Sequence, residues 1–235
     1  MSNHVDLLAF GPHPDDLEIG LGGTLAKHAA LGHRVGLCDL TRGELSSNGT
    51  PEERVREAEE ARKVLGVLWR ENLGLPDRAI GTDPDHARLA VEVIRRARPR
   101  AVALPYWGDR HPDHSAASAM LRDAVFNCKL RRYKAAGDPW QPDWVCFYFI
   151  NDSVPASFVV DVSSYYDVKR RALACYGSQF TRATEYAETR LNSPGFTRLI
   201  ESRDAQFGAL AGVAFAEGIL VNEPVVRNHL LKSEN

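Results

Sequence analysis

Short apolar runs alternate with helix-forming stretches through the first half of the chain, and this alternation restricts the fold more than any other feature of the sequence. Each run typical of a buried strand is followed by helical spacing, capping residues or helix stops. The strands are expected at 5–10, 34–40, 69–73 and 101–105, and the helices at 20–31, after the N-cap Thr50, and at 84–98. This order predicts an α/β fold, a Rossmann-like three-layer sandwich with helices on both faces of a mostly parallel sheet.

The second half carries weaker signals of the same kind. Helices are expected over 115–130 and 165–176, and strands over 145–150 and 158–162. The turn residues between them, at 137–142, are typical of a loop rather than of a domain linker. We therefore expect residues 1–235 to form a single domain.

The composition argues against several classes of partner. Lys and Arg number 29 against 31 Asp and Glu, so the chain has no positive excess for nucleic acid or for an anionic membrane surface. The N-terminus lacks the basic and apolar segments of a signal peptide, and no apolar run is long enough to span a bilayer. The four cysteines form no Cys-x-x-Cys pair, which favours reduced thiols. These features predict a cytoplasmic protein without nucleic-acid or membrane partners.

Two related motifs follow the first and the fourth predicted strands. They are His13-Pro14-Asp15-Asp16 and His111-Pro112-Asp113-His114. In open α/β sheets, ligands bind at the carboxyl ends of the strands where the strand order reverses. In the common order 3-2-1-4, strands one and four are neighbours at that point, so we expect the two motifs to face each other across one crevice.

The side chains of these motifs have the chemistry of a zinc site. His13 and Asp16 lie three residues apart, so one turn can present both, and His114 can supply a third ligand from the facing motif. Two imidazoles and a carboxylate suit Zn²⁺, and three protein ligands leave one position open for water. The sequence predicts one zinc ion per chain.

The remaining motif residues would lie near the metal without binding it. Asp15 could act as a general base, and His111 could stabilise an oxyanion or protonate a leaving amine. Asp113 could hold that imidazole in the needed tautomer. The alternative for Asp15 or Asp16 is a structural role as the N-cap of the following helix.

Two features lie outside the motifs. The glycine-rich segment 20–24 does not directly follow a strand, which argues against a nucleotide loop and favours close helix packing or a tight turn. Arg54 shares a helical stripe with Ala58, Ala61 and Leu65. Its side chain therefore points toward the interior or the crevice, unless it snorkels to the surface.

With these motifs the chain resembles the LmbE-like (PIG-L) family of zinc-dependent N-acetylglucosaminyl deacetylases. The resemblance covers nearly the whole chain, and both His-Pro-Asp motifs are specific to the family. The most similar branch is the deacetylase of bacillithiol biosynthesis, which acts on N-acetylglucosaminyl-malate. The matching segments are 11–18, 22–24, 38–44, 47–50, 72–78, 109–114, 176–180 and 214–218.

The resemblance implies the same division of roles among the motif residues. It makes His13, Asp16 and His114 the zinc ligands. It makes Asp15 the general base and His111 the oxyanion or acid histidine, which Asp113 orients.

The resemblance also implies roles beyond the motifs. Arg54 would contact the substrate, and Arg110 would meet the malate carboxylates, unless Arg110 only pairs with Asp109 or another surface acid. Relatives can carry a tyrosine where this chain has Phe196, which puts any role of that hydroxyl in doubt here. Relatives also form homo-oligomers, often hexamers, and the same is expected of this chain.

We therefore expect a zinc amidohydrolase that removes the acetyl group from N-acetylglucosaminyl-malate and releases acetate. The nearest alternatives keep the chemistry and change the substrate: free N-acetylglucosamine, chitobiose-type sugars, or S-conjugates of bacillithiol. A metal phosphoesterase often uses two metals and more ligands than the three counted here. A metal-stabilised oligomer subunit would need a closed site of four ligands.

Overall fold

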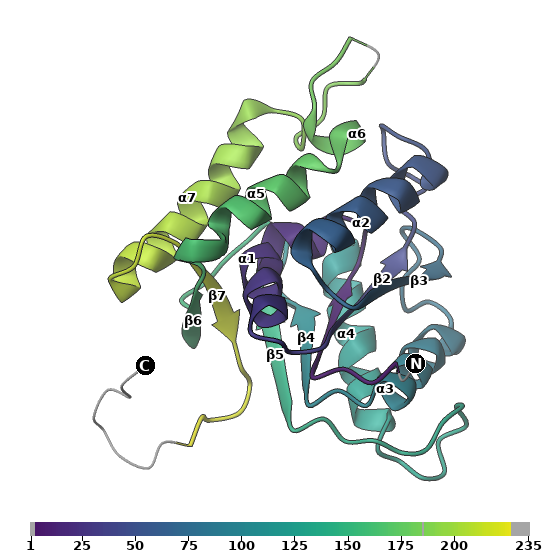
Figure 1. Ribbon diagram of the computed structural model, residues 1–235. Coiled ribbons are helices and arrows are strands. Elements are labelled where there is room, and N and C mark those ends of the chain that lie inside the picture. The colour runs from purple at the N-terminus through teal and green to yellow at the C-terminus, as the bar shows by residue number, and fades with distance from the viewer. Residues whose placement is uncertain (1–2, 185, 227–235) are drawn as a thin grey trace.

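The computed structural model describes residues 3–184 and 186–226 and shows helices on both faces of a seven-stranded sheet (Figure 1). The strands lie in the order β3-β2-β1-β4-β5-β7-β6. Only β7 runs antiparallel to its neighbours, β5 and β6, among the strands described. The bounds are β1 Leu7–Gly11, β2 Val35–Thr41, β3 Trp69–Leu75, β4 Ala101–Pro105, β5 Trp144–Tyr148, β6 Phe158–Asp161 and β7 Ala216–Leu220. The predicted α/β fold with a mostly parallel sheet is confirmed.

The helices form the two outer layers. Alternate residues of β1 point to opposite faces: Leu8 and Phe10 pack with α3 and α4, whereas Leu7 and Ala9 pack with α1, α2, α5 and α7. Figure 1 shows these two groups of helices on either side of the sheet. The bounds are α1 Asp16–Ala30, α2 Pro51–Leu65, α3 Pro84–Ala97, α4 Pro112–Asn127, a 3-10 turn Ser163–Tyr165, α5 Tyr166–Ala174, α6 Gly177–Phe180 and α7 Pro194–Ala211.

Local sequence signals explain several helix ends. The Thr50 side chain accepts a hydrogen bond from the Glu53 N–H at 3.1 Å, which confirms it as the N-cap of α2. α1 begins at Asp16, four residues earlier than the apolar spacing predicts, and α4 begins at Pro112 rather than at Ser115. In both helices the polar first turn interrupts the apolar pattern and belongs to the candidate site.

The sequence patterns predicted neither α7 nor β7. β7 is almost wholly buried and α7 is buried along one face, but their buried positions include the charged residues Arg203 and Asp204 in α7 and Glu217 in β7. Charges at interior positions break the apolar period from which the helix or strand would be recognised.

The glycine-rich segment of α1 allows close packing, as one of the two alternatives predicts. A Cβ on Gly22 would lie 2.9 Å from Cγ of Lys169, and a Cβ on Gly23 would lie 2.6 Å from Cβ of Val162. Larger residues at these positions would push α5 and its preceding turn away from α1.

Among the residues described, no helix is long and apolar enough to cross a bilayer.

Candidate active site

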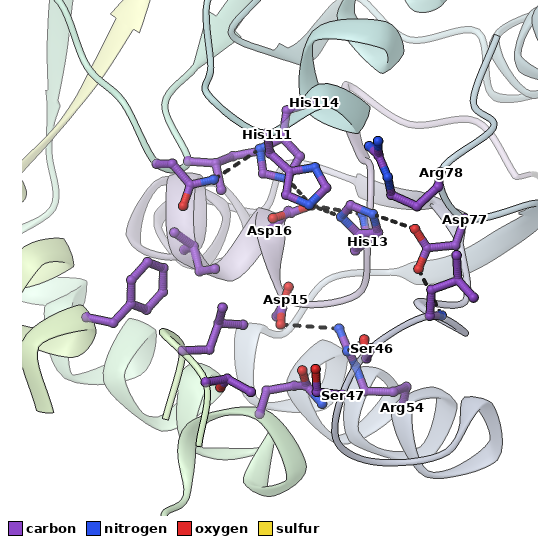
Figure 2. A pocket seen from close by; sticks show the side chains of 18 residues that line it. His13, Asp15, Asp16, Ser46, Ser47, Arg54, Asp77, Arg78, His111 and His114 are labelled. Carbon is purple, nitrogen blue, oxygen red and sulfur yellow. Dashed lines mark hydrogen bonds and ion pairs between the residues drawn. The ribbon is translucent and has the colours of Figure 1, made fainter. Parts of the chain in front are cut away.

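The two His-Pro-Asp motifs meet in one pocket at the carboxyl ends of β1 and β4, which are adjacent parallel strands. The pocket has a volume of about 350 Å³. Figure 2 shows His13, Asp16, His111 and His114 on one side of it, Ser46, Ser47 and Arg54 on the other, and Asp15 between the two groups. Of the eight residues predicted for the site, six line the pocket: His13, Asp15, Asp16, Arg54, His111 and His114. Sequence order alone therefore predicted that the two motifs meet at the carboxyl ends of adjacent strands.

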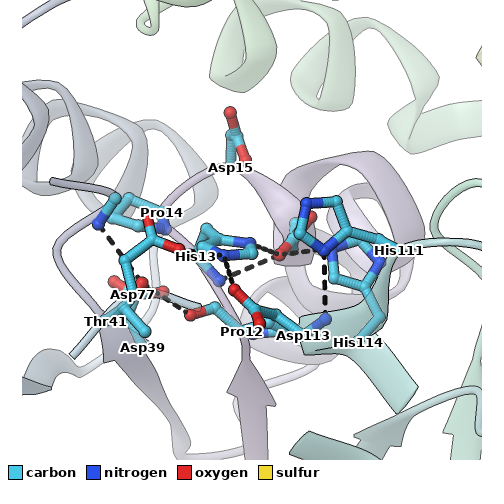
Figure 3. Close-up of polar contacts among 12 residues, drawn as sticks. Pro12, His13, Pro14, Asp15, Asp39, Thr41, Asp77, His111, Asp113 and His114 are labelled. Carbon is cyan, nitrogen blue, oxygen red and sulfur yellow. Dashed lines mark hydrogen bonds and ion pairs between the residues drawn. The ribbon is translucent and has the colours of Figure 1, made fainter. Parts of the chain in front are cut away.

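Three side chains converge as a metal-ligand group. Oδ2 of Asp16 lies 3.1 Å from Nδ1 of His13 and 3.3 Å from Nε2 of His114. Figure 2 labels all three residues, and Figure 3 shows His13 and His114 in close-up. One ligand atom from each of these residues lies within 4.8 Å of the others. His13 comes from the turn after β1 and His114 from the first turn of α4, so the fold brings together ligands that are 101 positions apart.

The electrostatics of this group suit a divalent cation. Burial lowers the pKa of His114, but the Asp16 and Asp109 carboxylates outweigh it and raise that pKa to about 9. Burial likewise disfavours the charged form of His13, yet hydrogen bonds to Asp113, Asp16 and Asp77 raise its pKa well above the usual value. Without metal, two imidazolium charges thus surround one carboxylate. A divalent cation can replace the two protons at the same net charge.

Asp109 fixes the orientation of His114. Its Oδ1 lies 3.0 Å from Nδ1 of His114 and accepts the backbone N–H of His111 at 2.9 Å. Asn151 donates to both carboxylate oxygens, from its backbone N–H at 2.8 Å and from Nδ2 at 3.1 Å. A carboxylate behind a histidine sets which ring nitrogen faces the metal. Sequence reasoning gave Asp109 no such part, although its place two residues before His111 was the available signal.

Asp113 lies against His13 rather than against the ring of His111. Its Oδ2 is 3.2 Å from Nε2 of His13, and its carboxylate also accepts the N–H and Nη1 of Arg78, both at 3.0 Å. Asp77 lies beside it, with Oδ1 3.4 Å from Nε2 of His13. The contact expected between Asp113 and His111 is made only by the Asp113 backbone N–H, which donates to Nδ1 at 3.2 Å. His111 is the N-cap of α4, so the Asp113 side chain projects past it toward β1.

Asp15 occupies the N-cap position of α1, but its side chain makes no capping hydrogen bond. Its φ of 108° lies in the left-handed region, which a non-glycine residue adopts at a cost in strain. Its Oδ2 lies 3.2 Å from Nη2 of Arg54, as Figure 2 shows. Burial raises the pKa of Asp15 to about 7, although Arg54 opposes that rise. The Asp15 carboxyl group is thus buried, is not part of the candidate ligand group, and has a pKa near neutral pH.

Arg54 is buried in the pocket wall and does not snorkel, with 2% of its surface exposed. Nη1 donates to Oγ of Ser46 at 2.9 Å, and Nη2 donates to the carbonyl of Pro14. Nε has no partner. Arg54 therefore stiffens the turn that carries Asp15 and keeps one unused donor.

Arg110 is exposed, and it is not among the residues that line the pocket. Its backbone N–H donates to Oδ2 of Asp152 at 2.7 Å. Arg78, which sequence reasoning did not single out, lines the pocket instead, with 49% of its side chain exposed. Phe196 also lines it and is buried.

Comparison with known proteins places the chain in a family. Residues 8–125 match the PIG-L family, described as GlcNAc-PI de-N-acetylase. A diacetylchitobiose deacetylase from Thermococcus kodakarensis is 31% identical over 91% of this chain and 81% of the relative. The chain belongs to the PIG-L family. This confirms the family and the enzyme class expected from the motifs: PIG-L members are deacetylases, that is, amidohydrolases, and they depend on a metal.

Other similarities agree with this PIG-L assignment. A 1D-myo-inositol 2-acetamido-2-deoxy-alpha-D-glucopyranoside deacetylase from Segniliparus rotundus is 27% identical over 79% of this chain and 80% of the relative. The solved structure of the conserved protein TT1542 from Thermus thermophilus has a TM-score of 0.88 at 38% identity, covering 97% of this chain and all of that one. The two deacetylases named here carry diacetylchitobiose and an inositol conjugate in their names, so the bacillithiol branch stays a prediction.

Proposed function

We propose that this chain is a zinc-dependent deacetylase of an N-acetylglucosamine conjugate, with one Zn²⁺ held by His13, Asp16 and His114. One observation carries the proposal: three ligand-type side chains converge in a pocket beside a buried carboxyl group, Asp15, that is not part of the ligand group. When bound, the metal supplies Lewis-acid polarisation of the acetyl carbonyl and activates water. Three protein ligands are typical of catalytic zinc.

Asp15 is proposed to take the proton from the attacking water. A general base works best with a pKa near the working pH, and the pKa of Asp15 is about 7. Arg54 holds the carboxylate in place through Oδ2 and leaves the other oxygen, Oδ1, for the water proton. The left-handed backbone at Asp15 directs the side chain into the pocket and away from the helix end.

His111 is proposed to donate a hydrogen bond to the tetrahedral oxyanion or to protonate the leaving amine. Burial lowers the pKa of His111, which favours the neutral ring. Because Nδ1 accepts the N–H of Asp113, the proton of the neutral ring lies on Nε2. Asp113 is proposed to orient His13 through Nε2, so that Nδ1 faces Asp16.

For the substrate, we propose N-acetylglucosaminyl-malate of bacillithiol biosynthesis. The resemblance supports it, and so do the cations near the pocket: Arg54 and Arg78 in the lining and Arg110 outside it. A bidentate guanidinium recognises a carboxylate well. Diacetylchitobiose is the second candidate, because the 31% identical relative bears that activity in its name.

The test is acetate release by zinc-loaded protein from N-acetylglucosaminyl-malate, diacetylchitobiose, a 1-O-inositol conjugate and free N-acetylglucosamine. We expect the highest kcat/KM with the malate conjugate and one zinc per chain by elemental analysis. A phosphate monoester serves as the control substrate for the phosphoesterase alternative. Absence of acetate from every sugar, with zinc bound, would contradict the deacetylase proposal.

The assembly expected from the resemblance is also part of this proposal. We propose a cytoplasmic homo-oligomer, with a hexamer as the expected size. Light scattering coupled to gel filtration gives the mass directly, and a monomer at micromolar concentration would contradict it.

A further inference from the structure

α7 carries a buried arginine that contacts the segments behind both halves of the candidate metal site. Nη2 of Arg203 donates to the carbonyl of Ile19 at 2.7 Å. Nη1 donates to the carbonyls of Phe149 at 3.1 Å and Ile150 at 2.8 Å. Nε donates to Oδ1 of Asp204 at 3.0 Å. The planar guanidinium thus holds three main-chain groups at fixed directions.

The contact with Ile19 leads to the first half of the site. Ile19 follows the first turn of α1, and its N–H donates to the carbonyl of Asp15 at 2.9 Å. The same turn carries Asp16, whose Oδ2 faces both histidine ligands. Arg203 therefore fixes the helical turn from which Asp15 and Asp16 project.

The contacts with Phe149 and Ile150 lead to the second half. Ile150 directly precedes Asn151, which donates to both oxygens of Asp109. Oδ1 of Asp109 in turn lies 3.0 Å from Nδ1 of His114. A short hydrogen-bonded path therefore joins Arg203 to the ligand supplied from β4 and α4.

Buried charges hold Arg203 in place. Nζ of Lys169 donates to Asp204 at 2.6 Å and to Glu217 at 2.7 Å, and Oη of Tyr166 donates to Asp204 at 3.1 Å. The Lys169 and Asp204 side chains are fully buried. Removing charges from water is costly, and apolar residues often fill such a space at least as stably. Core stability alone does not explain the cluster.

We propose that Arg203 is a positioning residue for the metal site. Its guanidinium sets the separation between the turn that carries Asp16 and the segment that orients His114. The inference rests on the proposed function, because it requires that His13, Asp16 and His114 bind the metal. It assigns Arg203 an effect on metal affinity and geometry that a purely structural arginine would not have.

The chain offers a matched control in Arg95 of α3. This arginine is also buried, with 4% exposed, and also donates to main-chain carbonyls. Its acceptors are the carbonyls of Cys128, Leu130, Ala135 and Gly137. Neither Arg95 nor these four residues line the pocket. Arg95→Lys therefore removes comparable bonds without touching the site.

The experiment compares Arg203→Lys with Arg95→Lys and wild type. Zinc affinity is measured by competition with a chromophoric chelator, and ligand geometry by the visible absorption of the Co²⁺-substituted protein. We expect both variants to lower Tm. Only Arg203→Lys should weaken zinc binding, by roughly 10- to 100-fold, the usual effect of groups behind the ligands, and change the Co²⁺ spectrum.

Wild-type zinc affinity and Co²⁺ spectrum in Arg203→Lys would overturn the inference, and so would equal losses in both lysine variants. If Arg203→Lys does not fold, Asn151→Ala tests the same path closer to the site, and unchanged zinc affinity in that variant overturns the inference. Failure of the wild-type protein to bind zinc would instead contradict the proposed function itself.

Discussion

The two His-Pro-Asp motifs start with the same three residues, yet the structure uses them differently. After β1 the helix begins only at Asp16, so His13 and Asp15 lie in the turn before it. After β4 the helix begins at Pro112, so Asp113 already lies in its first turn. The later helix start leaves His13 in the turn, where it belongs to both groups of side chains that could hold a metal, whereas His111 is the N-cap of α4 and its Nδ1 accepts the N–H of Asp113. The same three residues thus take different positions because the helix starts at a different point of each motif.

The largest expected effect separates the ligands of the two motifs from His111. His13→Ala and His114→Ala should each lose zinc and with it nearly all activity. The fold should survive, because both side chains lie beyond the carboxyl ends of the strands and outside the two main apolar cores. His111→Ala should keep zinc and lose roughly 10²- to 10³-fold in kcat, the usual effect of removing an oxyanion donor. Elemental analysis of the purified variants is the measurement. Stoichiometric zinc in His114→Ala would show that the ligand set is wrong.

The next effect separates the two aspartates that occupy the third position of each motif. Asp15→Asn should keep zinc and lower kcat by roughly 10²- to 10⁴-fold, the usual contribution of a general base. Steady-state kinetics together with metal content provide the check.

Asp113→Asn is the control within the same pair. Since its carboxylate contacts Nε2 of His13, we expect it to weaken zinc binding by roughly 10- to 100-fold. If Asp113→Asn instead left zinc affinity intact and lowered only kcat, the orientation of His111 that the sequence suggested would be the better account. Zinc loss in Asp15→Asn would exchange the roles of Asp15 and Asp16.

The sequence predicted the sheet order around the site because its signals there are local. Apolar strands, the Thr50 cap and the place of each motif after a strand are all visible without knowing the tertiary structure. The partners of the motifs were not visible in this way. Asn151 and Asp77 act through contacts made only after folding, and no spacing along the chain marks them. Asp109 is marked only by its place two residues before His111.

The second half shows the same limit on a larger scale. Its inner positions include Arg203, Asp204 and Glu217: Asp204 pairs with the adjacent Arg203, and Lys169 of α5 pairs with both Asp204 and Glu217. A prediction based on apolar periodicity treats such positions as surface. The elements that support the site from behind were therefore the least predictable part of the fold.

A smaller effect concerns two arginines near the second motif, Arg78 and Arg110. With N-acetylglucosaminyl-malate, loss of a charged hydrogen bond of roughly 1.5–3 kcal/mol should lower kcat/KM by roughly 10- to 150-fold. We expect this loss for Arg78→Ala, whose side chain lines the pocket, and a smaller one for Arg110→Ala, whose side chain does not. Free N-acetylglucosamine should be hydrolysed equally by wild type and Arg110→Ala. Arg78→Ala should lose less activity on the free sugar than on the malate conjugate, but not none, because Nη1 of Arg78 also binds Asp113. Equal losses on both substrates would mean that these arginines support the site rather than bind malate.

The smallest effect compares the two stacked histidines of the second motif, whose ring centroids are 4.5 Å apart. The carboxylates of Asp16 and Asp109 raise the pKa of His114 to about 9 against the effect of burial, whereas burial lowers the pKa of His111. At pH 8 the metal-free protein therefore carries a second ring proton on His114 that zinc must displace, whereas the His111 ring is already neutral and releases none.

His13, whose pKa is also raised, should release a second proton at the same time. At pH 8, where Asp15 is already ionised, zinc binding should release about two protons, since ligating imidazoles must be neutral. The number follows from the slope of the calorimetric binding enthalpy against the ionisation enthalpy of the buffer. It should fall as the pH rises through 9 and stay unchanged in His111→Ala. A release that vanished at pH 8 would mean that the imidazoles of His13 and His114 are neutral before the metal binds, and that Asp16 and Asp109 do not hold protons on them.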